Sequence, residues 1–528
     1  MNRAAIVMLV LAAVGVAAWV WNWVETGAGD EPKQVTVSRE TTYLTSPLAA
    51  DGLVDYLAAL NAPLKEVKPE DNAAALLAQA VGPSAAPKET AEQFFRLLGI
   101  PRPPDNGEYL IDDLEFAERK KLPDSESALK EFDEGRKRPW LAAERPLAME
   151  LLAANERPLR LVIEASRRKS FAVPYLPTGD PPIAMNCHLD LAQAGRTCVR
   201  LLTLRAMRSL GEGKLDAAYE DIDACYRLGD LVGGGAKSLI EGLVATALRN
   251  VSLQVERNAA FSGKAPRERL RERAARIEAM PPPVDLSTSF DQGERLMALD
   301  AMSAVVLHGA ERVFPRAGGA NESGRRHPPQ APATYEEAMR TTTKAFDEAL
   351  EALRLADYRA RQEALEGLGE RLSARAKAFA DRQKTFFLFR ESRPAHPRGP
   401  KADAGQAMAE TLISISVPAW ASADGARTRA LTEQRQTVLA LTFAAWKAER
   451  GAYPTKAIAG NLKLRPETLV DPFSGRPFVD RTLNGKRQFV SVGYDGLLGS
   501  KINPGDRGVT AADLAAAPPV DDIVLELP

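Results

Sequence analysis

Residues 191–229 read LAQAGRTCVRLLTLRAMRSLGEGKLDAAYEDIDACYRLG, which is the clearest signal of supersecondary structure in the chain. Apolar side chains recur at helical spacing in each half, and the GEGK segment at 211–214 separates the halves with a stop and a restart signal. The stretch therefore predicts two antiparallel helices joined by a short turn. The first apolar stripe comprises Leu191, Ala194, Cys198, Leu201 and Leu202. The second comprises Leu215, Ala218, Ile222, Cys225 and Tyr226.

Helical patterns continue on both sides of this hairpin. The second half of the hairpin is similar to the small-residue pattern of tetratricopeptide hairpins, but no second copy follows at that period, so a helical bundle and a repeat array both stay open. Proline and glycine predict an interruption of the last helix near Pro418 and Gly425. Short strands are expected at 488–492 and 523–527. The further helices are expected at 236–258, 268–280, 290–313, 335–389 and 406–450.

These patterns predict a mostly α protein with a small α+β module at the C-terminal end. Glycine- and proline-rich or polar stretches mark the expected boundaries. The expected parts are a transmembrane anchor (1–26), a linker (27–48), a helical domain (49–315), a linker (316–334), a charged helical segment (335–392), a linker (393–405) and a C-terminal domain (406–528).

The N-terminal residues have the composition of a membrane anchor. The run from Ala4 to Val24 is apolar except for Asn22, and it is long enough to span a hydrocarbon core of about 30 Å. Arg3 precedes the run and acidic residues follow it, so the N-terminus is expected in the cytoplasm and the bulk of the chain outside the inner (cytoplasmic) membrane. The alternative is a cleaved signal peptide.

The overall charge gives no reason to expect nucleic acid as a partner. The chain has 69 basic and 70 acidic residues, and its formal net charge is −1. Such a balance produces no global attraction to polyanions. Hydrophobic residues make up 45% of the chain, which is enough to build a globular core.

The last part of the chain carries a family resemblance. A helix ending in GAYPT at 451–455 is followed by DPFSGRPF at 471–478, SVGYDG at 491–496 and DDIV at 521–524. This order resembles the C-terminal domain of the major pseudopilin of type II secretion systems. The layout of the whole chain is similar to that of uncharacterised membrane-anchored planctomycete proteins with a helical middle region. The pilin leader and its early glutamate are absent from the N-terminal sequence, so the resemblance is confined to the C-terminal part.

The pseudopilin resemblance implies a calcium site. In that family the turn and the acidic tail bind calcium, and Asp495, Asp521 and Asp522 match the acidic positions in order. The segment LLGSK at 497–501 departs from the family because it lacks a carboxylate and adds a cation. The alternative is a hairpin turn at Asp495 and an acidic pair that precedes an edge strand. No other cofactor is expected.

Two cysteines are candidates for a disulfide. Cys198 lies about as far before the hairpin turn as Cys225 lies after it, and both belong to the apolar stripes. Outside the cytoplasm a disulfide could form between them, and two buried free thiols are the alternative.

Residues that could carry catalysis are few. Cys187, His188 and Asp190 lie within one short segment, but nucleophilic triads are usually assembled from distant segments, so a loop-to-helix junction is the alternative. The sequence cannot pair the carboxylates of Asp112, Asp113 and Glu115 with one another. Common hydrolase, zinc and phosphate-loop motifs do not occur in the sequence.

The sequence therefore predicts a non-enzymatic, membrane-anchored envelope protein that binds other proteins as a scaffold. A type II secretion or pilus-like system is one setting for such a role. The alternative is an extracytoplasmic solute- or polymer-binding protein with a groove in its helical region. The expected partners are the membrane, through residues 4–24, and proteins of the cell envelope.

Overall fold

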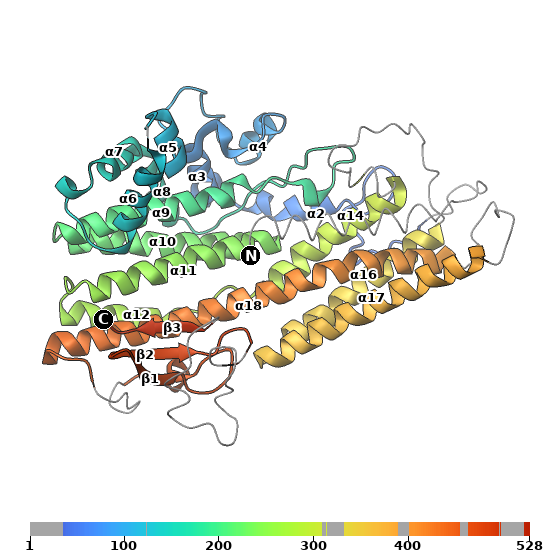
Figure 1. Cartoon of the computed structure of the whole chain (residues 1–528). Coiled ribbons are helices and arrows are strands. Elements are labelled where there is room, and N and C mark those ends of the chain that lie inside the picture. Colours follow the sequence, from blue (N-terminus) through green and yellow to red (C-terminus); the bar gives the residue numbers. More distant parts are fainter. Residues whose placement is uncertain are drawn as a thin grey trace, which may run out of the picture.

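The structure, a computed structural model, describes residues 35–122, 124–308, 313, 332–388, 401–454, 463–495, 497 and 522–528. Helices dominate these ranges, and one small antiparallel sheet lies near the C-terminal end (Figure 1). The predicted fold class, mostly α with a small C-terminal sheet, is confirmed. The predicted anchor at 4–24 lies outside the described ranges. Within those ranges, no helix has both the length and the apolar character that crossing a bilayer requires.

Short helices form a layer at the N-terminal end, and polar side chains fix where several of them begin. Asp55, Asn72, Asp112 and Asp124 each accept a backbone N–H of the first turn that follows, so donors left free by the helix geometry are satisfied. These helices are α2 (Tyr56–Asn61), α3 (Ala73–Val81), α4 (Ala91–Leu97), α5 (Asp113–Arg119), α6 (Ser125–Lys137), α7 (Pro146–Ala154) and α8 (Glu156–Ser166).

The predicted hairpin is present as α9 (Asp190–Gly211) and α10 (Leu215–Gly235). Its apolar stripes are buried, apart from the half-buried Ala194 and Leu215. Gly211 allows the backbone of Trp140 to approach, because a Cβ there would lie 2.0 Å from the Trp140 carbonyl oxygen. The predicted third helix is α11 (Leu239–Phe261), which begins with a capping box of Ser238 and Glu241, and α12 (Arg267–Ala279) follows it.

One long helix connects the parts of the molecule. Helix α18 (Lys401–Arg450) has 50 residues and runs along the length of the structure (Figure 1). Its N-terminal half packs against α16 (Pro332–Leu353) and α17 (Tyr358–Leu388), and its C-terminal half packs against α11 and α12. Most of helix α18 belongs to the predicted segment 406–528, and this helix contacts both of the other predicted segments, 49–315 and 335–392. Residues 332–334 and 401–405, at the ends of the predicted linkers, are helical.

The predicted interruption of this helix near Pro418 and Gly425 is wrong, since α18 continues through both residues. Proline removes one helical hydrogen bond, but packing on each side of it compensates. Trp420 lies against the rings of Phe290 and Phe346, with centroid distances of 4.8 and 5.0 Å. Gly425 provides the space for Tyr494, whose ring would lie 2.7 Å from a Cβ at that position.

A short irregular region precedes the long helices. It contains α13 (Leu286–Ser289), the single π-helical turn η6 (Phe290–Glu294) and α14 (Arg295–His308). The π-helical turn brings the backbone of Gly293 against the carbonyl of Lys237, where a Cβ would lie 1.5 Å from the oxygen. This close approach fixes α14 against the start of α11.

The sheet has three antiparallel strands in the order β1 (Val479–Leu483), β2 (Lys486–Ser491) and β3 (Ile523–Glu526). Strands were expected at 488–492 and 523–527, and both are present within a residue or two. Strand β1 was not predicted. Asn484 and Gly485 connect it to β2 with positive φ angles of 52° and 77°, which is typical of a two-residue hairpin turn.

Asp471 explains why the DPFSG and SVG segments occur together in the sequence. Its carboxylate is 1% exposed. It accepts the hydroxyls of Ser474 and Ser491 at 2.9 and 2.7 Å and the N–H groups of Phe473 and Val492 at 3.1 and 3.3 Å. Through these hydrogen bonds the carboxylate connects the loop before β1 to the end of β2.

Gln436 on α18 attaches the sheet to the helical part. Its amide donates to the carbonyls of Phe489 at 3.1 Å and Ile523 at 2.8 Å, and Phe443 stacks on Phe489 with a centroid distance of 5.1 Å. All of these groups are buried, so the amide satisfies acceptors that water cannot reach.

We expect Gln436→Ala to destabilise the protein by roughly 2–4 kcal/mol, because two buried carbonyls lose their donors. Hydrogen exchange should show faster exchange of the amides in β2 and β3 than in the unmodified protein. Thr442→Ala on the same helix is the control, since among the described residues the Thr442 hydroxyl bonds to the Val438 carbonyl one turn earlier and to no other group. Equal protection of the sheet in the Gln436 variant and the unmodified protein would contradict this role.

Candidate functional site

In the segment with Cys187, His188 and Asp190, the imidazole has Asp190 and Thr178 as neighbours. His188 Nδ1 lies 3.7 Å from the Asp190 carboxylate, and its Nε2 lies 3.2 Å from the Thr178 hydroxyl. Burial and the nearby carboxylates of Asp300 and Glu241 raise the pKa of the Cys187 thiol to about 12. A thiol in this environment stays protonated, so it is a poor nucleophile.

The carboxylates of Asp112, Asp113 and Glu115 have structural partners. Asp112 caps α5, and Glu115 pairs with an arginine on the same helix. Asp113 is buried and pairs with Arg136 at 2.5 Å and Arg200 at 2.7 Å. The structure therefore places these three carboxylates in a helix cap and in ion pairs.

The residues predicted for calcium are only partly described. Asp495 is exposed and accepts the Leu497 N–H at 2.7 Å, and Asp522 lies near the Arg481 guanidinium, whose charge it favours. Asp521 lies outside the described ranges. In the part of the chain that is described, no three His, Cys, Asp or Glu residues are grouped as a metal site would require. A neighbouring arginine disfavours a cation, and the calcium site stays a prediction.

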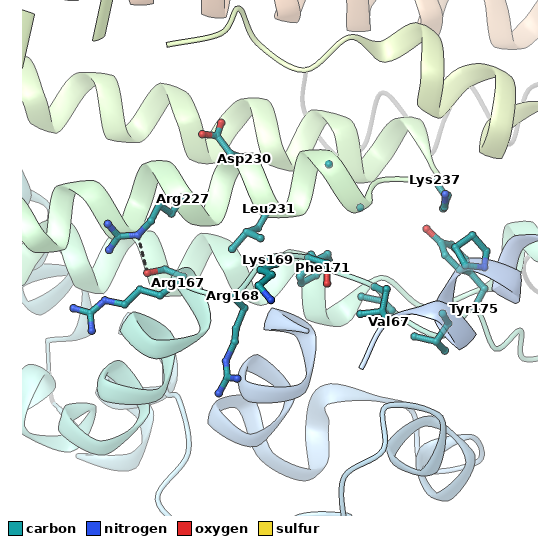
Figure 2. Close-up of a pocket in the computed structure, with 18 of the residues that line it drawn as sticks. Val67, Arg167, Arg168, Lys169, Phe171, Tyr175, Arg227, Asp230, Leu231 and Lys237 are labelled. Atoms are coloured by element: carbon teal, nitrogen blue, oxygen red, sulfur yellow. Dashed lines mark hydrogen bonds between the residues drawn. The ribbon is translucent and has the colours of Figure 1, made fainter. Parts of the chain in front are cut away.

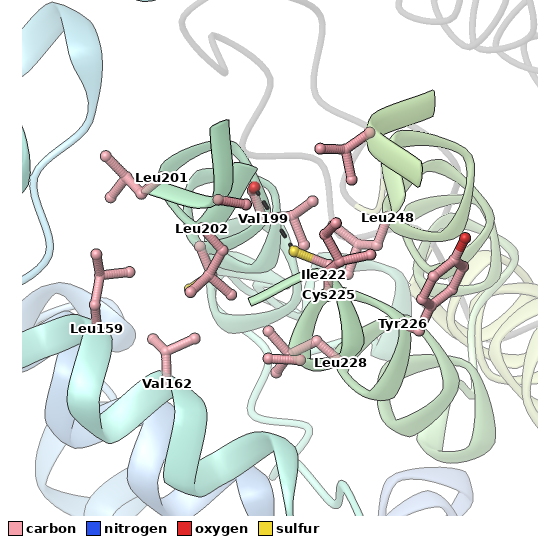
Figure 3. Close-up of a cluster of buried hydrophobic side chains, with 14 of the residues drawn as sticks. Leu159, Val162, Val199, Leu201, Leu202, Ile222, Cys225, Tyr226, Leu228 and Leu248 are labelled. Carbon is pink, nitrogen blue, oxygen red and sulfur yellow. Dashed lines mark hydrogen bonds between the residues drawn. The ribbon is translucent and has the colours of Figure 1, made fainter. Parts of the chain in front are cut away.

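Cys198 and Cys225 lie on facing helices, as predicted. Both are fully buried and are free thiols in the structure. The Cys225 thiol points to the Val199 carbonyl of α9, with Sγ 3.9 Å from the oxygen (Figure 3). Burial raises the pKa of both thiols, and for Cys225 the neighbouring Asp221 and Cys198 raise it further. The disulfide between them stays a prediction.

A groove whose residues the sequence did not identify lies between α8, α10 and the 3₁₀-helix η1 (Ala62–Glu66) (Figure 2). Its volume is about 540 Å³. One wall is the loop after α8, and the other wall is the last two turns of α10. The apolar lining comprises Leu60, Pro63, Leu64, Val67, Phe171, Ala172, Val173 and Leu231.

Positive charge dominates the lining of this groove. The charged side chains are Arg167, Arg168, Lys169, Arg227 and Lys237 against the single carboxylate of Asp230.

Ion pairs hold four of these cations in place. Arg167 and Arg227 share the carboxylate of Glu220 at 2.9 and 2.8 Å. Arg168 pairs with Glu164 at 2.6 Å, and Lys169 pairs with Asp71 at 2.9 Å. None of the three partner carboxylates is a lining residue. Exposed pairs of this kind are weak and can be shared with an incoming anion.

The carboxylate of Asp230 points away from the groove, toward α11 (Figure 2). It pairs with Arg249 at 3.2 Å, and Arg249 also reaches Gln434 on α18 at 3.1 Å. Partial removal from water raises the pKa of Asp230, and Arg249 opposes that shift. The one acidic group of the lining is therefore directed to an internal partner, which leaves the groove with an excess of positive charge.

Two asparagines hold the loop wall in position. Asn61 accepts the N–H of Tyr175 at 2.8 Å and donates to its carbonyl at 2.9 Å. Asn72 does the same for Ala172, at 3.0 and 2.8 Å. Each side-chain amide thus makes, with one residue of the wall, the two backbone hydrogen bonds that a neighbouring β-strand would make. Gly235 allows the wall to meet α10, because a Cβ there would lie 1.8 Å from the Phe171 carbonyl oxygen.

The buried carboxylate of Glu241 lies beside one end of the groove, where it contacts two residues of the lining. The hydroxyl of Tyr175 donates to Glu241, which also accepts the N–H of Lys237 at 3.0 Å. Burial raises the pKa of Glu294, and it raises the pKa of Asp300 to about 6, against the effect of the Ala184 N–H, which donates to Asp300 at 2.6 Å. Of these acids, Glu241 contacts residues of the groove lining, through Tyr175 and Lys237.

The local signals of the groove are the run Arg167-Arg168-Lys169 and the run Gly233-Gly234-Gly235. Neither run identifies a site by itself, because basic residues after a helix also stabilise its C-terminal end. Comparison of the chain with protein-family models, curated proteins and solved structures finds no match. The resemblance to the pseudopilin family therefore stays a prediction.

Counting thiols under denaturing, non-reducing conditions tests the disulfide. A Cys198–Cys225 bridge leaves one reactive thiol, that of Cys187, whereas three reactive thiols would exclude the bridge. Protein isolated from the oxidising side of the membrane is the appropriate sample, because reduction in the cytoplasm would hide the bridge. Cys187→Ser is the control, and it should lower either count by one.

We expect Asp300→Asn to raise stability at neutral pH. The native pKa of Asp300, about 6, exceeds its ordinary value of 3.8, so the native state binds more protons between these values and loses stability as pH rises through that window. At pH 7 the asparagine variant should be more stable by roughly 1–3 kcal/mol, and near pH 4 the two proteins should be equal. Urea unfolding across this range measures the difference. A difference that does not grow with pH would contradict burial of the carboxyl group.

Proposed function

We propose that this protein is a non-enzymatic, membrane-anchored binding protein of the cell envelope, and that the basic groove holds an anionic segment of a partner. The observation that carries the proposal is the excess of positive charge around a preformed groove. Five cations line it, and its one carboxylate is paired with Arg249. A concave site with one sign of charge concentrates ligands of the opposite sign.

The size and lining of the groove favour binding. A volume of about 540 Å³ falls within the range of about 300–1,000 Å³ that is typical of ligand sites. The lining residues include no histidine, cysteine or glutamate, and its serines, Ser166 and Ser170, have no histidine beside them in the lining. Acid–base and nucleophilic catalysis usually depend on such groups. The composition of the groove therefore favours recognition over reaction.

The anchor and the C-terminal module give the proposal its setting. The apolar run at 4–24 would hold the chain at the membrane with its helical part outside. The pseudopilin-like order of residues 451–524 makes a component of a type II secretion or pilus-like system a reasonable partner. The function of the groove does not depend on that choice.

Reversal of two exposed cations of the groove tests the proposal. We expect Arg167→Glu/Lys169→Glu in the detergent-solubilised full-length chain to weaken binding of fluorescent polyglutamate and of inorganic polyphosphate by at least about tenfold. These side chains are 60% and 81% exposed, so the fold should tolerate the change. Fluorescence anisotropy gives the affinity, and higher salt should weaken binding to the unmodified protein.

Lys88→Glu/Arg160→Glu is the matched control. It makes the same change of charge at two exposed residues outside the groove. Equal loss of binding in both double variants would show that net charge matters and the groove does not. Absence of binding of either polyanion to the unmodified protein would reject the proposal.

A further inference from the structure

The loop wall of the groove has backbone groups available for a ligand. Asn72 holds both backbone groups of Ala172, and Asn61 holds both groups of Tyr175. Among the residues described, no hydrogen bond reaches the N–H or the C=O of Val173, which lies between them and lines the groove. Val173 is half-buried. A backbone donor and acceptor in such a position need a partner, either water or another chain.

These free groups face the cavity. Val173 and Leu176 each precede a proline, which favours an extended backbone in this segment. Backbone groups of successive residues in an extended chain point to opposite sides. The groups of Ala172 point to Asn72, so those of Phe171 and Val173 point the other way, and the Phe171 carbonyl does meet Gly235 at the end of α10.

Space for a chain exists on that side. Gly234 lines the groove, and nothing lies within 4 Å of the position that a Cβ would take there. The apolar side chains of Leu60, Leu64 and Leu231 offer contacts for an apolar residue of a ligand. Lys169 precedes this wall and Lys237 follows the last turn of α10, so both ends of the free backbone have a cation nearby.

We propose that the groove binds an extended acidic peptide that pairs with the backbone N–H and C=O of Val173. This inference rests on the proposed function, since it names the ligand of the same groove. A peptide supplies the acceptor and the donor that Val173 needs, and its acidic side chains reach the cations on both sides. Polyphosphate supplies acceptors alone and leaves the Val173 carbonyl without a donor.

The test uses the detergent-solubilised full-length chain and a labelled peptide, Gly-Asp-Glu-Leu-Asp-Glu-Gly. Val173→Pro removes the N–H of residue 173, and we expect it to weaken binding of the peptide about 3–10-fold. Val173→Ala keeps the N–H and should change peptide affinity less than about twofold. Thermal unfolding checks that both variants are folded.

A change in the probe tests the same bond without a change in the protein. The peptide with methyl groups on the three central backbone nitrogens should bind the unmodified chain about 3–10-fold more weakly than the unmethylated peptide. Lysines in place of the four acidic residues should abolish binding. Peptide binding that is insensitive both to Val173→Pro and to methylation would overturn backbone pairing.

The outcomes separate the two proposals. Polyphosphate binding that depends on Arg167 and Lys169, without binding of the acidic peptide, would overturn the peptide proposal and leave the anion-binding groove intact. Binding of neither probe would reject the proposed function itself.

Discussion

Three consecutive residues of α18 hold three other parts of the molecule, and the arrangement of the whole structure depends on them. Gln434 donates to the carbonyls of Ile277 and Met280 at the end of α12, at 3.1 and 3.2 Å. Arg435 donates to the Val470 carbonyl before the sheet at 2.6 Å, and Gln436 holds β2 and β3. Successive side chains of a helix point about 100° apart, so one turn can reach three directions. Helix α18 continues through Pro418. The position of this turn therefore also determines where the N-terminal half of α18 meets α16 and α17.

The groove is connected to the same turn. Arg249 on α11 pairs with Asp230 of the groove lining and reaches Gln434 of α18. The carboxylate of Asp230 is therefore used inside the helical part, and the cations around the groove are not neutralised by it. Removal of the Arg249 contact would leave a carboxylate free to turn toward the groove and lower its positive charge. The groove therefore depends for part of its positive charge on the contact between Arg249 and α18, although α18 contributes no residue to its lining.

The sequence predicted the elements whose signals are local. The apolar stripes of the hairpin and the short strands expected at 488–492 and 523–527 depend on residues close in the chain, and both were found. Asn484-Gly485 is an equally local signal for the β1–β2 hairpin and could have been used. The continuity of α18 could not be predicted, because the contacts of Trp420 and Gly425 come from distant residues. The groove could not be predicted for the same reason, since its lining comes from 60–67, 166–175 and 227–237.

Three backbone N–H groups at the start of α11 are paired within the protein. The free N–H groups at a helix N-terminus commonly bind anions. Here Glu241 accepts the N–H groups of Lys237 and Ser238, and Glu294 accepts that of Leu239 at 3.0 Å. The protein's own carboxylates thus occupy this end of the helix, and the rise in the pKa of Glu294 reflects its burial there. In the proposed binding mode an anion would instead meet the cations along the groove, whose ion pairs with Glu164, Glu220 and Asp71 it could share.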